Sequence, residues 1–200
     1  MGDKLADGVY TISSGGTDTI GGNYCNTNTI TRMMMRVCIV GHTKGLGQKL
    51  YQYFLQQGHD VVGFNSQDSL DNIIEQSMGC DLFINNAYSD DNIQLTLLHT
   101  LKDKVKKLIV CGSIVTDCPD PTDPIYTLNK NRLEEEFMKL AVNKIPSLAD
   151  MLLLKLTSSS YKDFETIKNS IMFWFDNPTV VVLTFNIDEK LQKEIKCQLK

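Results

Sequence analysis

Two side chains in this sequence have the types and the spacing for acid–base chemistry on an oxygen atom. Tyr126 and Lys130 are four residues apart, so they lie on one face of any helix that contains both. An ammonium group favours the ionised form of a neighbouring phenol, which suits the phenol to proton transfer near neutral pH. Ser113 stands thirteen residues before Tyr126 and closes an apolar segment. We therefore take Ser113, Tyr126 and Lys130 as the candidate reaction centre.

A glycine-rich turn indicates where a phosphate-containing cofactor would bind. The segment from Gly41 to Gly47 has the form G-x-x-x-G-x-G; it follows the apolar run 36–40 and opens a stretch of helical periodicity. A dinucleotide pyrophosphate needs close approach of the backbone and gains from the N–H groups at the start of a helix. Glycines at this spacing provide both. The candidate cofactor-binding residues here are Gly41, Thr43, Lys44, Gly45, Leu46 and Gly47.

Polar residues also follow the next two apolar segments. The candidates are Asn65, Ser66 and Asp68 after the run 60–64, and Asn85, Asn86 and Ala87 at the end of the run 80–86. An acidic side chain directly after the second strand would hydrogen-bond the ribose hydroxyls of NAD(H) and repel the 2′-phosphate of NADP(H). Because no acid stands there before Asp68, NADP(H) is favoured over NAD(H). The two asparagines need hydrogen-bond partners at the end of a buried strand.

Strands that alternate with helices position these residues. Short apolar runs predict strands buried on both faces, and apolar residues three or four apart predict helices. The predicted strands cover 36–40, 60–64, 80–86, 106–113, 151–156 and 179–185, and the predicted helices cover 46–58, 69–78, 92–103, 126–142 and 162–175. This alternation predicts an α/β fold of three layers with a doubly wound parallel sheet of about six strands. Open parallel sheets bind ligands at the carboxyl edge, where Ser113 would lie.

Length and charge narrow the function classes. The 200 residues allow one domain, with 33–200 as its compact part. Residues 1–32 are rich in Gly, Thr, Asn and Ser, which predicts a flexible or weakly β-structured appendage. The net charge of −4 and the pI near 5.4 give no excess positive field, so we expect neither nucleic acid nor a membrane surface as a partner. No segment approaches the roughly 18 apolar residues that span a bilayer.

The remaining polar residues give weaker signals. Six cysteines occur without any C-x-x-C pair, and three of them (Cys38, Cys80 and Cys111) fall in predicted buried strands. We therefore expect reduced core thiols and a cytoplasmic location. The three histidines lack metal-ligand spacing, so we expect no metal. The acidic run 134–136 is expected on a solvated helix face.

Together, the three motifs resemble those of the short-chain dehydrogenase/reductase family. The glycine turn, Asn-Asn-Ala, and Ser113 followed by Tyr126-x-x-x-Lys130 occur in the family's order between residues 36 and about 187. The resemblance implies a Rossmann fold and hydride transfer between a nicotinamide cofactor and a small carbonyl or alcohol substrate. It implies that Tyr126 is the general acid/base, that Lys130 also binds the nicotinamide ribose, and that Ser113 orients the substrate oxygen. In this family a basic residue at the position of Lys44 often accompanies NADP(H). A homodimer or homotetramer, paired through helices 92–103 and 126–142, is also implied.

The sequence departs from the family pattern at four places. Tyr88 replaces the glycine that follows Asn-Asn-Ala, and only sixteen residues separate Phe64 from Asp81, so one strand is missing. Asn92 stands at the wrong end of its helix to be the family's fourth catalytic residue. The residues after 156 lead almost directly into the next helix. Three alternatives stay open: a minimal reductase, a relative of the extended branch that reduces nucleotide-sugar ketones, and a cofactor-binding regulatory module without turnover.

Overall fold

The computed structural model describes residues 4–5, 9–12, 34–88, 91–117, 122–142, 148–156, 164–178 and 182–185. The six predicted strands are present as β3 (Arg36–Val40), β4 (Asp60–Phe64), β5 (Leu82–Asn85), β6 (Lys107–Ser113), β7 (Asp150–Leu156) and β8 (Val182–Phe185). They pair in parallel in the order β4-β3-β5-β6-β7-β8. The predicted parallel sheet of about six strands is therefore confirmed.

Two short strands from the N-terminal segment extend this sheet beyond the prediction. Strand β2 (Val9–Ile12) pairs in parallel with β8, and β1 (Lys4–Leu5) pairs antiparallel with β2. The whole sheet thus has eight strands, because the open edge of β8 offers unpaired backbone groups that β2 takes up. The rest of the segment lies outside the described residues, and the boundary at residue 33 stays a prediction.

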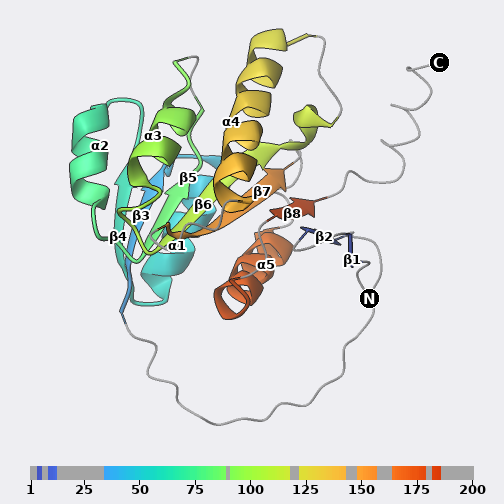
Figure 1. Cartoon of the computed structure of the whole chain (residues 1–200). Helices are drawn as coiled ribbons and strands as arrows, with labels where there is room; N and C mark the ends of the chain where they lie inside the picture. The colour runs from blue at the N-terminus through green and yellow to red at the C-terminus, as the bar shows by residue number, and fades with distance from the viewer. Residues whose placement is uncertain are drawn as a thin grey trace, which may run out of the picture.

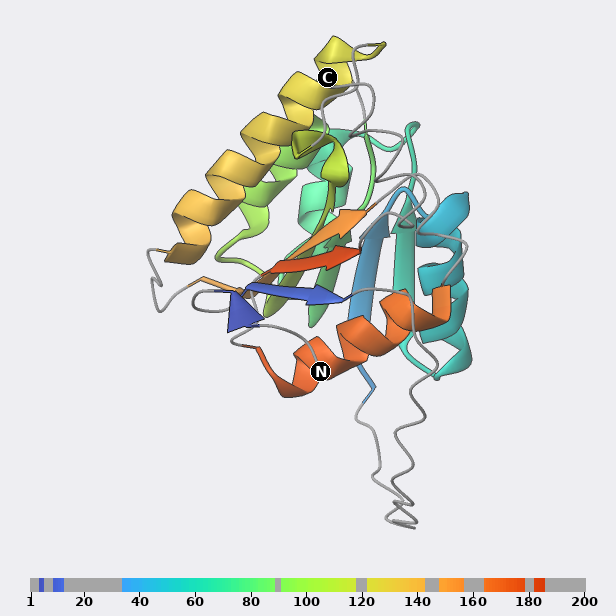
Figure 2. The same cartoon turned by 90° about the vertical axis from the view of Figure 1, so that its right-hand side faces the viewer.

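Helices cover both faces of the sheet and make the three predicted layers (Figures 1 and 2). Helices α1 (Gly45–Gln56) and α5 (Phe164–Asp176) pack on one face, with Phe54 and Trp174 in its apolar core. Helices α2 (Leu70–Ser77), α3 (Ile93–Leu101) and α4 (Pro124–Val142) pack on the other, with Leu97 and Phe137 in its core. The chain reverses its order across the sheet at β3, which lies between β4 and β5. Ligands of open α/β sheets bind beside such a reversal, outside the carboxyl ends of the strands.

Local sequence signals account for several of these boundaries. Ser69 caps α2, as expected, and accepts the backbone N–H of Asn72 at 3.2 Å. Only α2 connects β4 to β5, in agreement with the predicted missing strand. The thiols of Cys38, Cys80 and Cys111 are buried and free, whereas the other three cysteines lie outside the described residues. In the part of the chain that the structure describes, no helix is both long enough and apolar enough to cross a bilayer.

Candidate functional site

The glycine turn between β3 and α1 needs its glycines for two different reasons. Gly41 and Gly45 have positive φ angles of 83° and 58°, which residues other than glycine rarely adopt. Gly47 has no room for a side chain, because a Cβ there would lie 2.1 Å from the carbonyl oxygen of Gly41. The helix and the turn can therefore approach each other only with glycine at this position. The result is the bare backbone that the sequence predicts.

The start of α1 is open to solvent and carries no negative charge. Thr43, Lys44 and Gly45 are exposed, and the side chain of Lys44 makes no cap at the N-terminus of the helix. The first turn of α1 contains no acidic residue. The N–H groups and the positive end of the helix dipole are therefore positioned to bind an anion. Leu46 is buried in the core, so it can offer a ligand only its backbone.

The residues after β5 hold the glycine turn from the neighbouring strand. The backbone N–H of Asn86 donates to the carbonyl of Val40 at 3.3 Å, and its Nδ2 donates to the carbonyl of Gly41 at 3.2 Å. A Cβ on Gly41 would lie 3.1 Å from the Cα of Ala87, so these two backbones also approach closely. Asn86 and Ala87 thus lie at the turn, as predicted. The side chain of Asn85 is instead fully buried and donates to the carbonyl of Gln94 at 2.8 Å.

The carboxylate of Asp68 lies at the end of β4, although in the sequence Asp68 stands four residues after the last residue of this strand. Asp68 folds back, and its Oδ2 accepts the backbone N–H of Asn65 at 2.8 Å, while its Oδ1 accepts from Asn72 at 3.4 Å. Asn65 in turn accepts the N–H of Gln67 at 2.8 Å, and Ser66 is exposed. A negative charge therefore lies directly at the strand end, where it favours ribose hydroxyls and opposes a 2′-phosphate. Asp68 therefore favours NAD(H), whereas Lys44 favours NADP(H).

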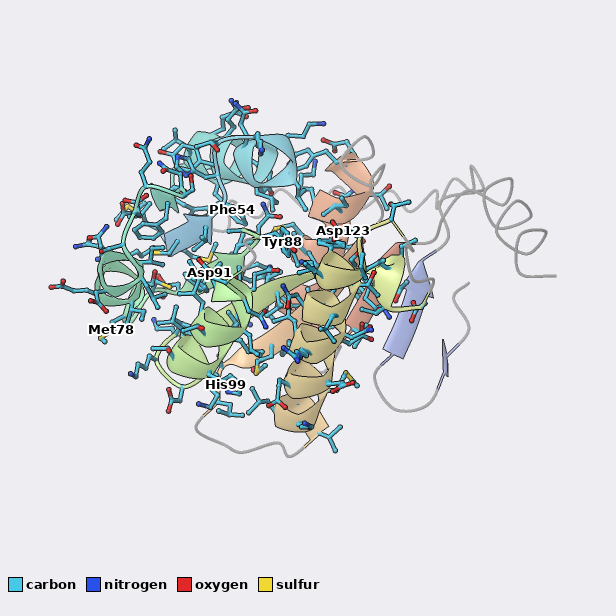
Figure 3. The ribbon with its side chains drawn as sticks, turned by 90° about the horizontal axis from the view of Figure 1, so that it is seen from above. Phe54, Met78, Tyr88, Asp91, His99 and Asp123 are labelled. Atoms are coloured by element: carbon cyan, nitrogen blue, oxygen red, sulfur yellow. The ribbon has the colours of Figure 1, made fainter. Side chains whose placement is uncertain are left out.

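Helix α4 positions Tyr126 and Lys130 through its own capping residues. It begins two residues earlier than predicted, with Pro124 in its first position. Asp123 caps the helix, because its Oδ1 accepts the backbone N–H of Tyr126 at 2.9 Å. Figure 3, a view from above, labels this aspartate and also Tyr88, whose ring contacts the ring of Tyr126 edge to face at a centroid distance of 4.8 Å. Tyr126 is half-buried in the first turn, and Lys130 lies one turn further along.

The ammonium group of Lys130 is buried in the reaction centre. The side chain is 6% exposed, and Nζ donates to Oε1 of Gln94 at 2.6 Å and to the carbonyl of Cys111 at 2.9 Å. Nζ also lies 5.5 Å from the ring centroid of Tyr126 and 5.9 Å from that of Tyr88. Burial lowers the pKa of Lys130 from 10.5 to about 8, and the Cys111 thiol opposes this only in part. A lysine with this pKa changes its charge close to physiological pH.

Ser113 comes to the same region from β6, which ends at this residue. Its side chain is buried, and Oγ accepts the backbone N–H of Val115 at 3.3 Å, which leaves the hydroxyl proton available to a substrate oxygen. The short helix η1 (Ile114–Thr116) follows and packs against α4. Because Lys130 bonds the carbonyl of Cys111, two residues before Ser113, strand β6 and helix α4 bring the reaction-centre candidates into one region.

Two features of this region could not be found from the sequence: the contacts of Gln94 and the ion pairs of a buried lysine. Lys155 on β7 is 5% exposed, and its Nζ lies 2.7 Å from Oδ1 of Asp117 and 2.9 Å from Oε1 of Glu134. The expectation of a solvated face for 134–136 is therefore wrong at Glu134, which ties α4 to the sheet. Asn92 directly precedes α3, as expected. Within the described ranges, no group of three or more His, Cys, Asp or Glu side chains could hold a metal ion.

Comparison with known proteins identifies the fold and no close relative. No model of a protein family matches the chain, and no curated protein matches its sequence. The bulky-bulky ketone specific alcohol dehydrogenase from Comamonas testosteroni aligns with a TM-score of 0.60 and 14% identity, over 84% of this chain and 93% of that chain. The 3-alpha-hydroxysteroid dehydrogenase from Pseudomonas sp. B-0831, solved with NADH, gives 0.59 and 12%, over 75% and 93%.

A third solved structure carries the name of the family that the motifs resemble. It is an oxidoreductase of the short chain dehydrogenase/reductase family from Brucella ovis, solved with partially ordered NAD. It aligns with a TM-score of 0.60 and 11% identity, over 76% of this chain and 100% of that chain. This chain therefore has the Rossmann fold of the short-chain dehydrogenases.

Proposed function

We propose that this chain, whose fold is that of the short-chain dehydrogenases, is an NAD(P)-dependent oxidoreductase. In this proposal it transfers hydride between a nicotinamide cofactor and a small carbonyl or alcohol substrate. The observation that carries the proposal is the buried ammonium group of Lys130, one helical turn from Tyr126 and bonded to the strand that ends in Ser113. A buried lysine with a strongly lowered pKa is typical of a functional site.

The residues of the glycine turn fit a nicotinamide dinucleotide. A Cβ at Gly47 would collide with the Gly41 carbonyl, and Gly41 has a positive φ and a tight contact of 3.1 Å to Ala87, so the turn keeps a bare surface beside the uncapped start of α1. The N–H groups from Thr43 to Gly47 would bind the pyrophosphate, and the exposed Lys44 would add a positive charge. When bound, the nicotinamide ring supplies or accepts the hydride.

The reaction-centre residues would handle the proton that accompanies the hydride. Tyr126 would give its phenolic proton to the substrate oxygen during reduction and take it back during oxidation. The Lys130 ammonium group would stabilise the phenolate of Tyr126 through its positive charge. Ser113 would donate its hydroxyl proton in a hydrogen bond that orients the same oxygen. These roles use groups that come from α4 and from the end of β6.

The cofactor preference rests on opposing charges. The exposed Lys44, together with Asn65 and Ser66 after β4, supports NADP(H), and Asp68 opposes it. We keep NADP(H) as the preferred cofactor, because the ammonium of Lys44, the amide of Asn65 and the hydroxyl of Ser66 would together offer donors to a 2′-phosphate, whereas Asp68 opposes it alone.

Steady-state assays with NADPH and NADH and a set of small ketones and aldehydes test the proposal. Tyr126→Phe should lower kcat by about 10²- to 10⁴-fold, the usual contribution of a general acid. Tyr53→Phe is the matched control, because Tyr53 packs on the aromatic rings of Phe54 and Phe164 on the opposite face of the sheet. Cofactor binding without turnover, unchanged in Tyr126→Phe, would instead identify a cofactor-binding module that has lost catalysis.

A further inference from the structure

The side-chain amide of Gln94 lies at the junction of three elements of the site. Gln94 is in the first turn of α3 and is 3% exposed. Its Nε2 donates to the carbonyl of Asn85 at 2.9 Å and to the carbonyl of Cys111 at 3.2 Å. Because both bonds go to backbone carbonyls, the orientation of the amide is fixed. Its oxygen must then be the atom that faces Lys130.

The amide oxygen of Gln94 is a neutral partner for a buried positive charge. Lys130 donates to this oxygen at 2.6 Å and to the carbonyl of Cys111 at 2.9 Å. In the described part of the chain, no ion pair to Lys130 is formed. The groups that face its ammonium are the rings of Tyr126 on α4 and Tyr88 after β5, and the thiol of Cys111 on β6. Two of the three ammonium protons are therefore in hydrogen bonds, and the third remains for the side on which the rings of Tyr126 and Tyr88 lie.

We propose that Gln94 is a positioning residue that holds the Lys130 ammonium group in place and keeps it charged beside Tyr126. The same amide bonds the carbonyl of Asn85, and the next residue, Asn86, holds the glycine turn. Gln94 thus connects the end of β5, which supports the cofactor turn, to the reaction centre on α4. Its effect on turnover rests on the proposed function, whereas its effect on the charge of Lys130 does not.

Two substitutions at Gln94 should change the charge of Lys130 in opposite directions. Gln94→Glu has nearly the same shape and places a carboxylate 2.6 Å from Nζ, so it should raise the pKa of Lys130. Gln94→Leu removes the acceptor and leaves the ammonium desolvated with one partner fewer, so it should lower this pKa. A residue that only ties the elements together would give variants of lower stability without this opposite response.

Lysine-selective NMR of the whole chain measures the effect directly. The side-chain signals of labelled lysines are titrated with pH, and Lys130→Arg identifies the signal of Lys130. We expect a fall of about one pH unit in Gln94→Leu and a rise of about one unit or more in Gln94→Glu. Gln52→Leu and Gln52→Glu, at an exposed position of α1, are the matched controls and should leave the value unchanged.

The outcomes separate this inference from the proposed function. An unchanged pKa of Lys130 in both Gln94 variants, or a shift in the same direction in both, overturns the inference. If Gln94→Leu does not fold, Gln94→Glu decides alone: a rise supports the inference and no rise overturns it. In an active enzyme, the alkaline limb of the kcat–pH profile should move with the pKa. A chain without any turnover would contradict the proposed function and would leave the NMR test intact.

Discussion

Replacement of Lys130 by methionine should change how the stability of the protein depends on pH. The pKa of Lys130 falls from 10.5 to about 8 on folding because the group is buried. At 1.36 kcal/mol per pKa unit, this burial destabilises the folded state by about 3 kcal/mol at neutral pH. Between these two pKa values Lys130 is protonated more often in the unfolded chain than in the folded protein. The free energy of unfolding of the wild type therefore rises with pH in this range. Relative to Lys130→Met, the wild type should gain roughly 2 to 3 kcal/mol between about pH 7 and about pH 10.

Urea unfolding of both proteins at several pH values in this range measures the difference. The absolute difference at pH 7 is less informative, because the methionine also leaves Oε1 of Gln94 without its donor, at about 1 to 3 kcal/mol, and removes one of the two donors to the carbonyl of Cys111. Lys104→Met, at an exposed position, is the control and should show no such trend. A difference in unfolding free energy between wild type and Lys130→Met that stays constant with pH would show that folding does not lower the pKa of Lys130.

Three further predictions concern the cofactor turn, cofactor preference and assembly. Gly47→Ala should abolish measurable binding of NADPH and NADH in a fluorescence titration, because its Cβ would lie 2.1 Å from the Gly41 carbonyl oxygen. Gly79→Ala is the control for a strained glycine outside the turn, since Gly79 has a φ of 73° and lies between α2 and β5, and it should bind normally. Equal binding by both variants would contradict the assignment. Asp68→Asn should strengthen the binding of NADPH relative to that of NADH by about fivefold or more, since it removes a negative charge. An unchanged ratio of the two Kd values would exclude Asp68 from the cofactor site. We also propose that two copies of the chain pair through α3 and α4. Light scattering should then show a dimer or a larger assembly, and Leu128→Lys, a change at an exposed position of α4, should weaken it. A wild-type monomer at micromolar concentration would contradict this pairing.

The fold could be predicted because its signals are local in the sequence. Apolar runs such as 36–40 and 107–113 form buried strands, since parallel strands that are covered on both faces bury nearly all of their side chains. The glycine turn was predictable for the same reason, because Gly41 to Gly47 fix the backbone within one short segment. The capping role of Ser69 likewise depends on neighbours three residues away.

The contacts that define the reaction centre could not be predicted in this way. Gln94 and Lys130 are 36 residues apart, and their hydrogen bond exists only because α3 and α4 pack side by side on the neighbouring strands β5 and β6. Helical periodicity likewise could not place Glu134 against Lys155, since that pairing depends on the position of β7. The return of Asp68 to Asn65 is a local contact over three residues, and the Asn-x-x-Asp spacing was the signal that could have found it.

Titration of the protein with NADPH and with NADH shows whether the glycine turn binds a nicotinamide cofactor. Trp174 is the one tryptophan of the sequence and is fully buried, so its emission and that of the bound nicotinamide report on binding together. We expect saturable binding of at least one cofactor, with NADPH the tighter. Failure of both cofactors to bind would contradict it.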